Sequence, residues 1–244
     1  YWMYQENDQF DGNTYFIQTQ DIYPGLRSDG DKQSFRPIGT VNHPFVSHYD
    51  GQGYALIDFD IHFNNGDMHG FFGRIFDNGS VRNLSIINVS LKNTSPNGEV
   101  GALAATVKFA TLENIYVSGT VEPGSAYDDY LGGLVAFVND YNESNNKTII
   151  RNVHSDIRFT NDNGYGYEGG IVAYPNSDNY PEFAQTITRN TIDGVLTDDT
   201  AGAFYNLYGS DTGYYQASNF VEATESGVYN NNNDVREGNM YRST

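Results

Sequence analysis

Several features that define common protein classes are missing from this chain of 244 residues. It contains no cysteine, which excludes a disulfide framework and thiolate chemistry. No apolar run approaches the roughly 18 residues needed to span a bilayer, so we expect no membrane insertion. Basic residues are scarce, 13 against 31 acidic ones, and the net charge of −18 repels phosphate backbones and anionic lipid headgroups. We therefore expect no nucleic-acid partner.

Helical patterns are also missing, whereas residues typical of strands and turns are abundant. Aromatic residues make up 15% of the chain, with 20 tyrosines and 15 phenylalanines, and 26 residues are glycine. This composition indicates a β-rich protein with many turns. The chain opens with "YWMYQENDQF" rather than with a signal peptide or an initiating methionine, and we expect it to be part of a longer, multidomain chain.

What the chain has in place of helices is a short phrase that returns along its length. Glycine stands beside a small apolar run in "HGFFG", "VGALA", "LGGLV", "EGGIV" and "AGAFY", at Gly70, Gly101, Gly132, Gly169 and Gly202. The spacings are 31, 31, 37 and 33 residues. An asparagine follows each phrase in the same order, at Asn83, Asn114, Asn152, Asn190 and Asn219. Two landmarks that recur together five times mark an internal repeat, and "ALIDFDI" resembles a sixth copy with Asp58 in the asparagine position.

Repeats of this length that consist only of strands predict an all-β, single-stranded parallel β-helix of about five or six coils. Each coil advances by one strand spacing, about 4.8 Å. The glycine phrases are then the same inward strand on successive coils, and the asparagines stack as an amide ladder at a turn. We divide the chain into an N-terminal cap or lead-in strand (1–34), the β-helix repeats (35–225) and a C-terminal cap or linker (226–244).

Three segments resemble the GLUG-type repeat of large bacterial surface proteins, including adhesins. They are "FRPIG" from Phe35, "FVSHYDGQGYALIDFDI" from Phe45 and "GFFGRIFDNGSVRNLSIINVSL" from Gly70. The resemblance covers about residues 14 to 196, and the chain departs from it with alanine in place of glycine at 104, 136 and 173. The resemblance implies a right-handed β-helix that is secreted or on the bacterial cell surface, and it transfers no catalytic site.

Tyrosine-rich acidic loops are the first candidate for ligand binding. A tyrosine offers a flat apolar face and a hydroxyl group, which suit stacking on a sugar ring, and neighbouring acidic residues add hydrogen bonds. We therefore predict a glycan or a glycosylated surface as the partner. The predicted contacts are Tyr127, Asp128, Asp129, Tyr130, Tyr165, Tyr167, Tyr205 and Tyr208.

Two other chemistries remain open. Calcium is a candidate ligand, since Asp128, Asp129, Asp162, Asp198 and Asp199 supply hard oxygen atoms in turns, although no known calcium motif is present. A polysaccharide lyase or glycoside hydrolase could also use this scaffold, with the row Arg82, Glu113, Arg151, Arg189 and nearby His154 as its exposed chemistry. Opposite charges on adjacent coils explain the row better as sheet stabilisation, by a few tenths of a kcal/mol (about 0.2–1) for each pair.

We thus interpret the chain as a secreted or cell-surface binding module of an adhesin-like protein. A carbohydrate-active enzyme is the first alternative, with its catalytic residues unknown, and a structural stalk segment is the second.

Overall fold

The computed structural model describes residues 11–25, 35–62, 68–92, 98–122, 130–140, 146–162, 167–175, 182–184, 187–188, 191–194, 219–223 and 239–243. These residues form strands and turns, and no helix occurs among them. Within the same residues there is accordingly no helical segment that could cross a bilayer.

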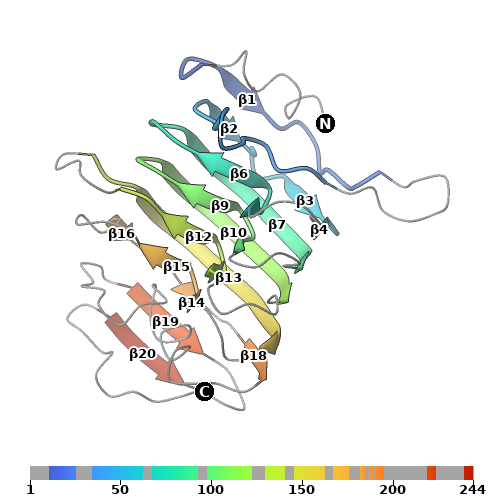
Figure 1. The fold of residues 1–244 in the computed structure, drawn as a ribbon, viewed down its shortest axis with the longest axis vertical. Helices are drawn as coiled ribbons and strands as arrows, with labels where there is room; N and C mark the ends of the chain where they lie inside the picture. The colour runs from blue at the N-terminus through green and yellow to red at the C-terminus, as the bar shows by residue number, and fades with distance from the viewer. Residues whose placement is uncertain are drawn as a thin grey trace.

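The described strands form three parallel sheets (Figure 1). The largest has 12 strands, in the order β1-β2-β7-β10-β13-β17-β19-β20, with β3 and β4 beside β7 and with β16 and β18 beside β13. Its members are β1 (Tyr15–Ile17), β2 (His48–Asp50), β3 (Ala55–Ile57), β4 (Asp60–His62), β7 (Ser80–Lys92), β10 (Thr111–Glu122), β13 (Ile149–Asp162), β16 (Glu182–Ala184), β17 (Ile187–Thr188), β18 (Thr191–Gly194), β19 (Asn219–Ala223) and β20 (Asn239–Ser243).

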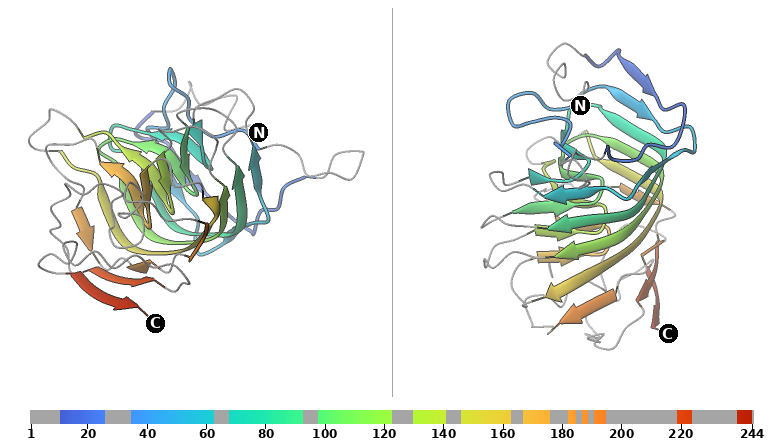
Figure 2. Two further views of the ribbon diagram at one scale, coloured as in Figure 1. Left: turned by 60° about the horizontal axis from the view of Figure 1, so that its bottom comes forward. Right: turned by 90° about the vertical axis from the view of Figure 1, so that its right-hand side faces the viewer.

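Two shorter sheets of four strands each complete the turns. One contains β5 (Met68–His69), β8 (Glu99–Gly101), β11 (Tyr130–Gly132) and β14 (Tyr167–Gly169). The other contains β6 (Phe72–Ile75), β9 (Ala104–Val107), β12 (Val135–Val138) and β15 (Val172–Pro175). The chain visits the three sheets in turn, and the strands stack from the N-terminal to the C-terminal end of the molecule (Figure 2). The prediction of an all-β parallel solenoid is confirmed.

The described glycine phrases occupy one position on successive turns, as the repeat predicted, while Gly202 lies outside the described residues. Gly132 lies in register with Gly101 on one side and with Gly169 on the other. A Cβ atom on Gly101 would lie 2.3 Å from the carbonyl oxygen of Ala104, closer than side chains approach in proteins. Glycine is therefore required here because the chain folds back on itself between two short strands.

The long strand β7 shows how the sheet bends around the core. Its buried residues are Val81, Leu84, Ile86, Val89 and Leu91. Two outward residues lie between Val81 and Leu84, and two more lie between Ile86 and Val89. Asn83 and Asn88 lie in these outward pairs with φ values of 54° and 56°. Asparagine tolerates this left-handed conformation better than most residues, and each one bends the strand without breaking the parallel ladder.

The core is a continuous column of apolar side chains between the three sheets. Leu84, Ile115 and Val153 stack on adjacent strands in the large sheet, and Val100 and Leu131 stack in a short one. Phenylalanines fill the N-terminal turns, where Phe45, Phe72 and their neighbours form an aromatic cluster. Each turn thus buries apolar surface that it could not bury alone.

The first turn differs from the one that the sequence predicted. Ala55, Leu56 and Ile57 pair with Ser85, Ile86 and Ile87, which places Asp58 beside Asn88 rather than in the row of landmark asparagines. Asn88 donates a hydrogen bond from Nδ2 to Oδ1 of Asp58 at 2.6 Å. The error arose because the positions of Asn83 and Asn88 both require a short, polar residue in the left-handed conformation. Asp58, with φ of 61°, occupies the position that corresponds to Asn88.

A buried carboxyl group holds the two ends of the segment that follows Val138. Asp140 is fully buried and accepts hydrogen bonds from the backbone N–H groups of Phe109 and Thr148, at 2.9 and 2.6 Å, and from the Thr148 hydroxyl at 2.9 Å. Burial raises the pKa of Asp140, against the effect of these donors. The Asp140 carboxyl group thus links Thr148, on the far side of residues 141–145, to Phe109 of the preceding turn.

Candidate binding groove

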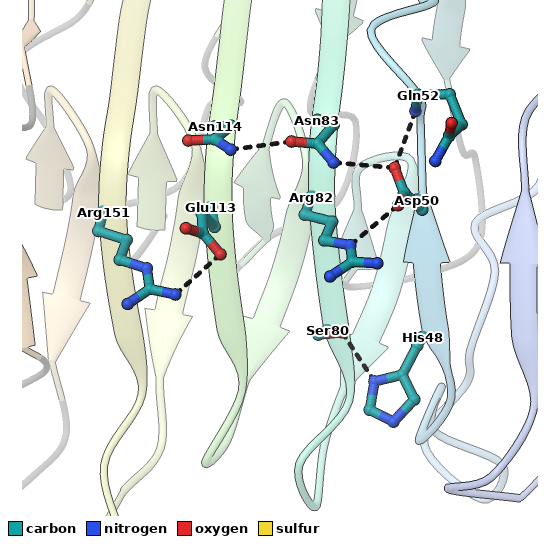
Figure 3. Close-up of polar contacts among 9 residues, drawn as sticks. All are labelled: His48, Asp50, Gln52, Ser80, Arg82, Asn83, Glu113, Asn114 and Arg151. Carbon is teal, nitrogen blue, oxygen red and sulfur yellow. Dashed lines mark hydrogen bonds and ion pairs between the residues drawn. The ribbon is translucent and has the colours of Figure 1, made fainter.

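A row of alternating charges runs across the outer face of the large sheet. Glu113 lies in register between Arg82 and Arg151, as predicted, and Asp50 extends the row beyond Arg82. Arg82 contacts Asp50 at 3.0 Å and Arg151 contacts Glu113 at 2.9 Å (Figure 3). Both arginine side chains are about half exposed, so each pair contributes at most about 1 kcal/mol to stability. The row does not continue to Arg189 as predicted, because Ala184 lies opposite Arg151 on the next strand.

The landmark asparagines form a second row beside the charges. Asn152 donates from Nδ2 to Oδ1 of Asn114 at 2.7 Å, and Asn114 donates to Asn83 at 2.8 Å. Asn83 in turn donates to Asp50 at 3.0 Å, which joins the amide row to the charge row (Figure 3). The predicted amide ladder is confirmed for these three positions. The prediction was wrong for the last two landmarks: Ile187 pairs with His154, which takes Asn190 out of the row, and Phe220 pairs with Ile187, which places Asn219 one position away from it.

The ladder faces outward, which the sequence did not indicate. Asn114 and Asn152 are exposed and Asn83 is half-buried. Each has φ between 50° and 55°, so the strands bend at these residues. The amides therefore form one wall of an open groove of about 510 Å³, within the range of about 300–1,000 Å³ that is common for ligand sites.

The groove repeats the same three positions on three neighbouring strands. Its lining residues are Asn83, Leu84 and Ser85 of β7, Asn114, Ile115 and Tyr116 of β10, Asn152, Val153 and His154 of β13, and Gly53 at the N-terminal end. The middle residue of each set is buried in the core, so the side chains of the first and third form the two walls. Because equivalent residues are in register, the groove crosses the strands and follows the axis of the solenoid.

The second wall carries an aromatic and titratable group of residues. The rings of Tyr116 and His154 pack edge to face with centroids 5.3 Å apart. Tyr116 donates its hydroxyl hydrogen to Oδ2 of Asp156 at 3.3 Å, and His154 Nε2 lies 3.8 Å from the same oxygen. This arrangement offers an apolar ring, a hydroxyl and an imidazole within one groove wall.

Asp50 is held in its charged form at the edge of the groove. Partial burial alone would raise its pKa, but hydrogen bonds from Asn83 and from the backbone N–H of Gln52, together with the Arg82 guanidinium, hold the pKa below its usual range. The carboxylate therefore remains an acceptor that anchors both rows at neutral pH.

The structure places few of the predicted tyrosine contacts. Tyr130 is half-buried and packs against Phe137 and Tyr174, with ring centroids 5.4 Å away in both cases. Tyr167 lies in register with Tyr130 on the next strand. The six other predicted contacts, Tyr127, Asp128, Asp129, Tyr165, Tyr205 and Tyr208, lie outside the described residues. Tyr130 thus belongs to an aromatic cluster on the short sheets, away from the groove of the large sheet.

Sequence reasoning treated the asparagines as purely architectural and did not select Tyr116. The sequence could have indicated the second wall, because the residues two places after aligned asparagines must also be aligned. These residues are Ser85, Tyr116 and His154. For calcium, no group of three or more acidic or histidine side chains gathers in the described part of the chain. Of the acidic residues proposed for calcium, Asp162 ends β13, and the others lie outside that part.

Comparisons with known proteins give partial matches. No family model matches the chain, and no solved structure matches it. Halomucin from Haloquadratum walsbyi is 33% identical over 120 residues, which are 46% of this chain and 1% of halomucin. A protein of Evansella cellulosilytica named as a Gly-rich membrane protein is 33% identical over 107 residues, which are 43% of this chain and 12% of that protein. The chain therefore spans only a small part of either relative.

Proposed function

We propose that this chain is a glycan-binding module of a cell-surface protein, with the groove of the large sheet as its binding site. The observation that carries the proposal is the threefold repetition of an asparagine and a polar or aromatic side chain along one groove. Amides and aromatic rings are suited to sugars, because they pair with hydroxyl groups and cover apolar ring faces. An adhesin-like role and GLUG-type repeats are part of this proposal.

The location at the cell surface is supported by the names of the relatives, a halomucin and a Gly-rich membrane protein. The net charge of −18 is compatible with an extracellular binding surface that does not attract nucleic acid. Of the predicted tyrosine contacts, Tyr130 would add a contact at the aromatic cluster on the short sheets.

A glycan array that is probed with the labelled chain, with calcium and with a chelator, tests the proposal. We expect binding to a subset of glycans, and loss of all signal on every glycan would contradict it. A signal that needs calcium would assign the metal a role. The double variant Tyr165→Ala and Tyr167→Ala tests the predicted tyrosine contacts separately, because it changes none of the residues that line the groove.

A polysaccharide-active enzyme is the second candidate, since Tyr116 and His154 beside Asp156 form a set with acid–base capacity. Glycoside hydrolysis requires a pair of carboxyl groups, and the residues described as lining the groove include none. A lyase is therefore the enzyme that this groove could support. Incubation with polysaccharides and measurement of chain length distinguishes it from a binding module, which leaves the chains intact.

A further inference from the structure

We infer that the groove binds a neutral, extended, β-linked polysaccharide that lies along the solenoid axis, with about one sugar unit for each strand. This inference rests on the proposed glycan-binding function and adds the class, the direction and the length of the ligand.

The direction follows from the register of the lining residues. Asn114 and Tyr116 are flanked by their equivalents on β7 and β13, so the same pair of walls is repeated at each strand. Strands are about 4.8 Å apart, and the groove from the level of Gly53 to β13 therefore extends about 14 Å. A sugar unit in an extended chain advances by a similar step, so that successive units meet equivalent side chains.

The hydrogen-bonding capacity of the ladder matches hydroxyl groups. Asn114 uses one of its two N–H donors on Asn83, and its oxygen accepts one hydrogen bond from Asn152. An amide has two donors and two acceptor lone pairs, so one donor and one acceptor remain on the exposed side chain. A sugar hydroxyl both donates and accepts, and one amide can therefore serve two neighbouring hydroxyl groups of a chain.

The charges beside the groove favour a neutral ligand. Each arginine of the charge row is paired, Arg82 with Asp50 and Arg151 with Glu113, so the row adds little net charge to the groove. The rest of the chain has an excess of acidic residues, which raises the energy of a polyanion that approaches it. Tyr116 supplies the apolar surface against which an uncharged ring can pack.

Two variants with the same backbone requirement test the assignment. Asn114 and Asn88 both have left-handed φ values, 55° and 56°, and both donate from Nδ2 to a side chain of the preceding turn, but only Asn114 lines the groove. Glycine adopts this conformation without steric cost, so Asn114→Gly and Asn88→Gly each remove an amide and retain the bend. Thermal unfolding of both variants verifies that they fold.

Isothermal titration calorimetry of the full chain with cello-oligosaccharides of two to six units, maltohexaose and polygalacturonate gives the readout. We expect affinity to increase up to about four units, cellohexaose to bind more tightly than the coiled maltohexaose, and polygalacturonate not to bind. Asn114→Gly should weaken cellohexaose binding about tenfold, the effect of one or two hydrogen bonds, while Asn88→Gly leaves the affinity unchanged.

The outcomes separate the inference from the function on which it rests. Tighter binding of polygalacturonate, equal binding of cellobiose and cellohexaose, or equal binding by Asn114→Gly and the unmodified chain would overturn the inference and leave glycan binding in place. Failure of the unmodified chain to bind any glycan on the array would overturn both.

Discussion

Replacement of Gly132 by alanine is the most direct test of how the turns stack. A Cβ atom at this position would lie 1.8 Å from the carbonyl oxygen of Val135 and 2.4 Å from its carbonyl carbon. Both are backbone atoms, and Val135 is paired with Ala104 on one side and Val172 on the other. Since Cβ contacts under 3.0 Å are essentially absent from real structures, β12 would have to move by more than about 1 Å.

The expected loss follows from what that movement disrupts. Overpacking costs about 1–3 kcal/mol even where side chains can adjust, and each displaced backbone hydrogen bond adds about 1 kcal/mol. We therefore expect Gly132→Ala to lower the free energy of unfolding by at least about 3 kcal/mol, measured by urea denaturation with far-ultraviolet circular dichroism.

Gly53→Ala is the matched control. Gly53 has φ of +83°, and a Cβ atom there would lie more than 4 Å from every residue other than its two chain neighbours. Alanine at this position therefore has only the left-handed backbone penalty of about 1–2 kcal/mol. If Gly132→Ala destabilised the protein no more than Gly53→Ala, the close packing of successive turns at the glycine phrase would be refuted.

Three further predictions concern the polar contacts, and all can be measured by urea denaturation. Asp140→Ala leaves two buried backbone N–H groups without their acceptor, so we expect a loss of about 3 kcal/mol. The pKa of Asp50 is lowered in the folded state. Its contribution to the free energy of unfolding is therefore present above about pH 4 and disappears as the pH falls through the pKa of the folded state. Asp50→Asn should reduce the difference in stability between pH 6 and pH 3. Glu113→Ala removes an exposed ion pair and should cost less than about 1 kcal/mol, with a smaller effect at high salt.

The repeat unit could be predicted from the sequence because its landmarks carry backbone requirements. Gly101, Gly132 and Gly169 mark a point at which two strands approach too closely for a side chain, and Asn83, Asn114 and Asn152 mark a left-handed bend. Each requirement restricts the choice of residue on every turn, and so the pattern survives in the sequence. The charge row followed from the same alignment.

The first turn could not be predicted in the same way, because Asp58 meets a requirement that two positions share. In β7 a second left-handed bend occurs at Asn88. The neighbouring strand β10 has no matching asparagine; instead its register with β7 shifts after Val117, which places Gly119 opposite Val89. Gly119 approaches the backbone of Val89 so closely that a Cβ atom would lie 2.0 Å from its oxygen. When one turn has a bulge that the next turn lacks, residues at the same spacing in the sequence no longer lie opposite each other. This offset can be seen only once the pairing of the strands is known.

The site was harder to predict than the fold because one of its two walls is formed by positions that the repeat leaves free. Ser85, Tyr116 and His154 are all polar but differ in size and in aromatic character, yet the register sets them side by side. The same holds on a short sheet, where Met68, Glu99 and Tyr130 lie in one row. Since the buried residues, the glycines and the landmark asparagines maintain the stacking, the other outer positions can change from turn to turn without loss of the fold. We therefore expect that the ligand contacts of such a solenoid vary along its axis while the spacing between them stays fixed, which makes chain length the most informative property of the ligand.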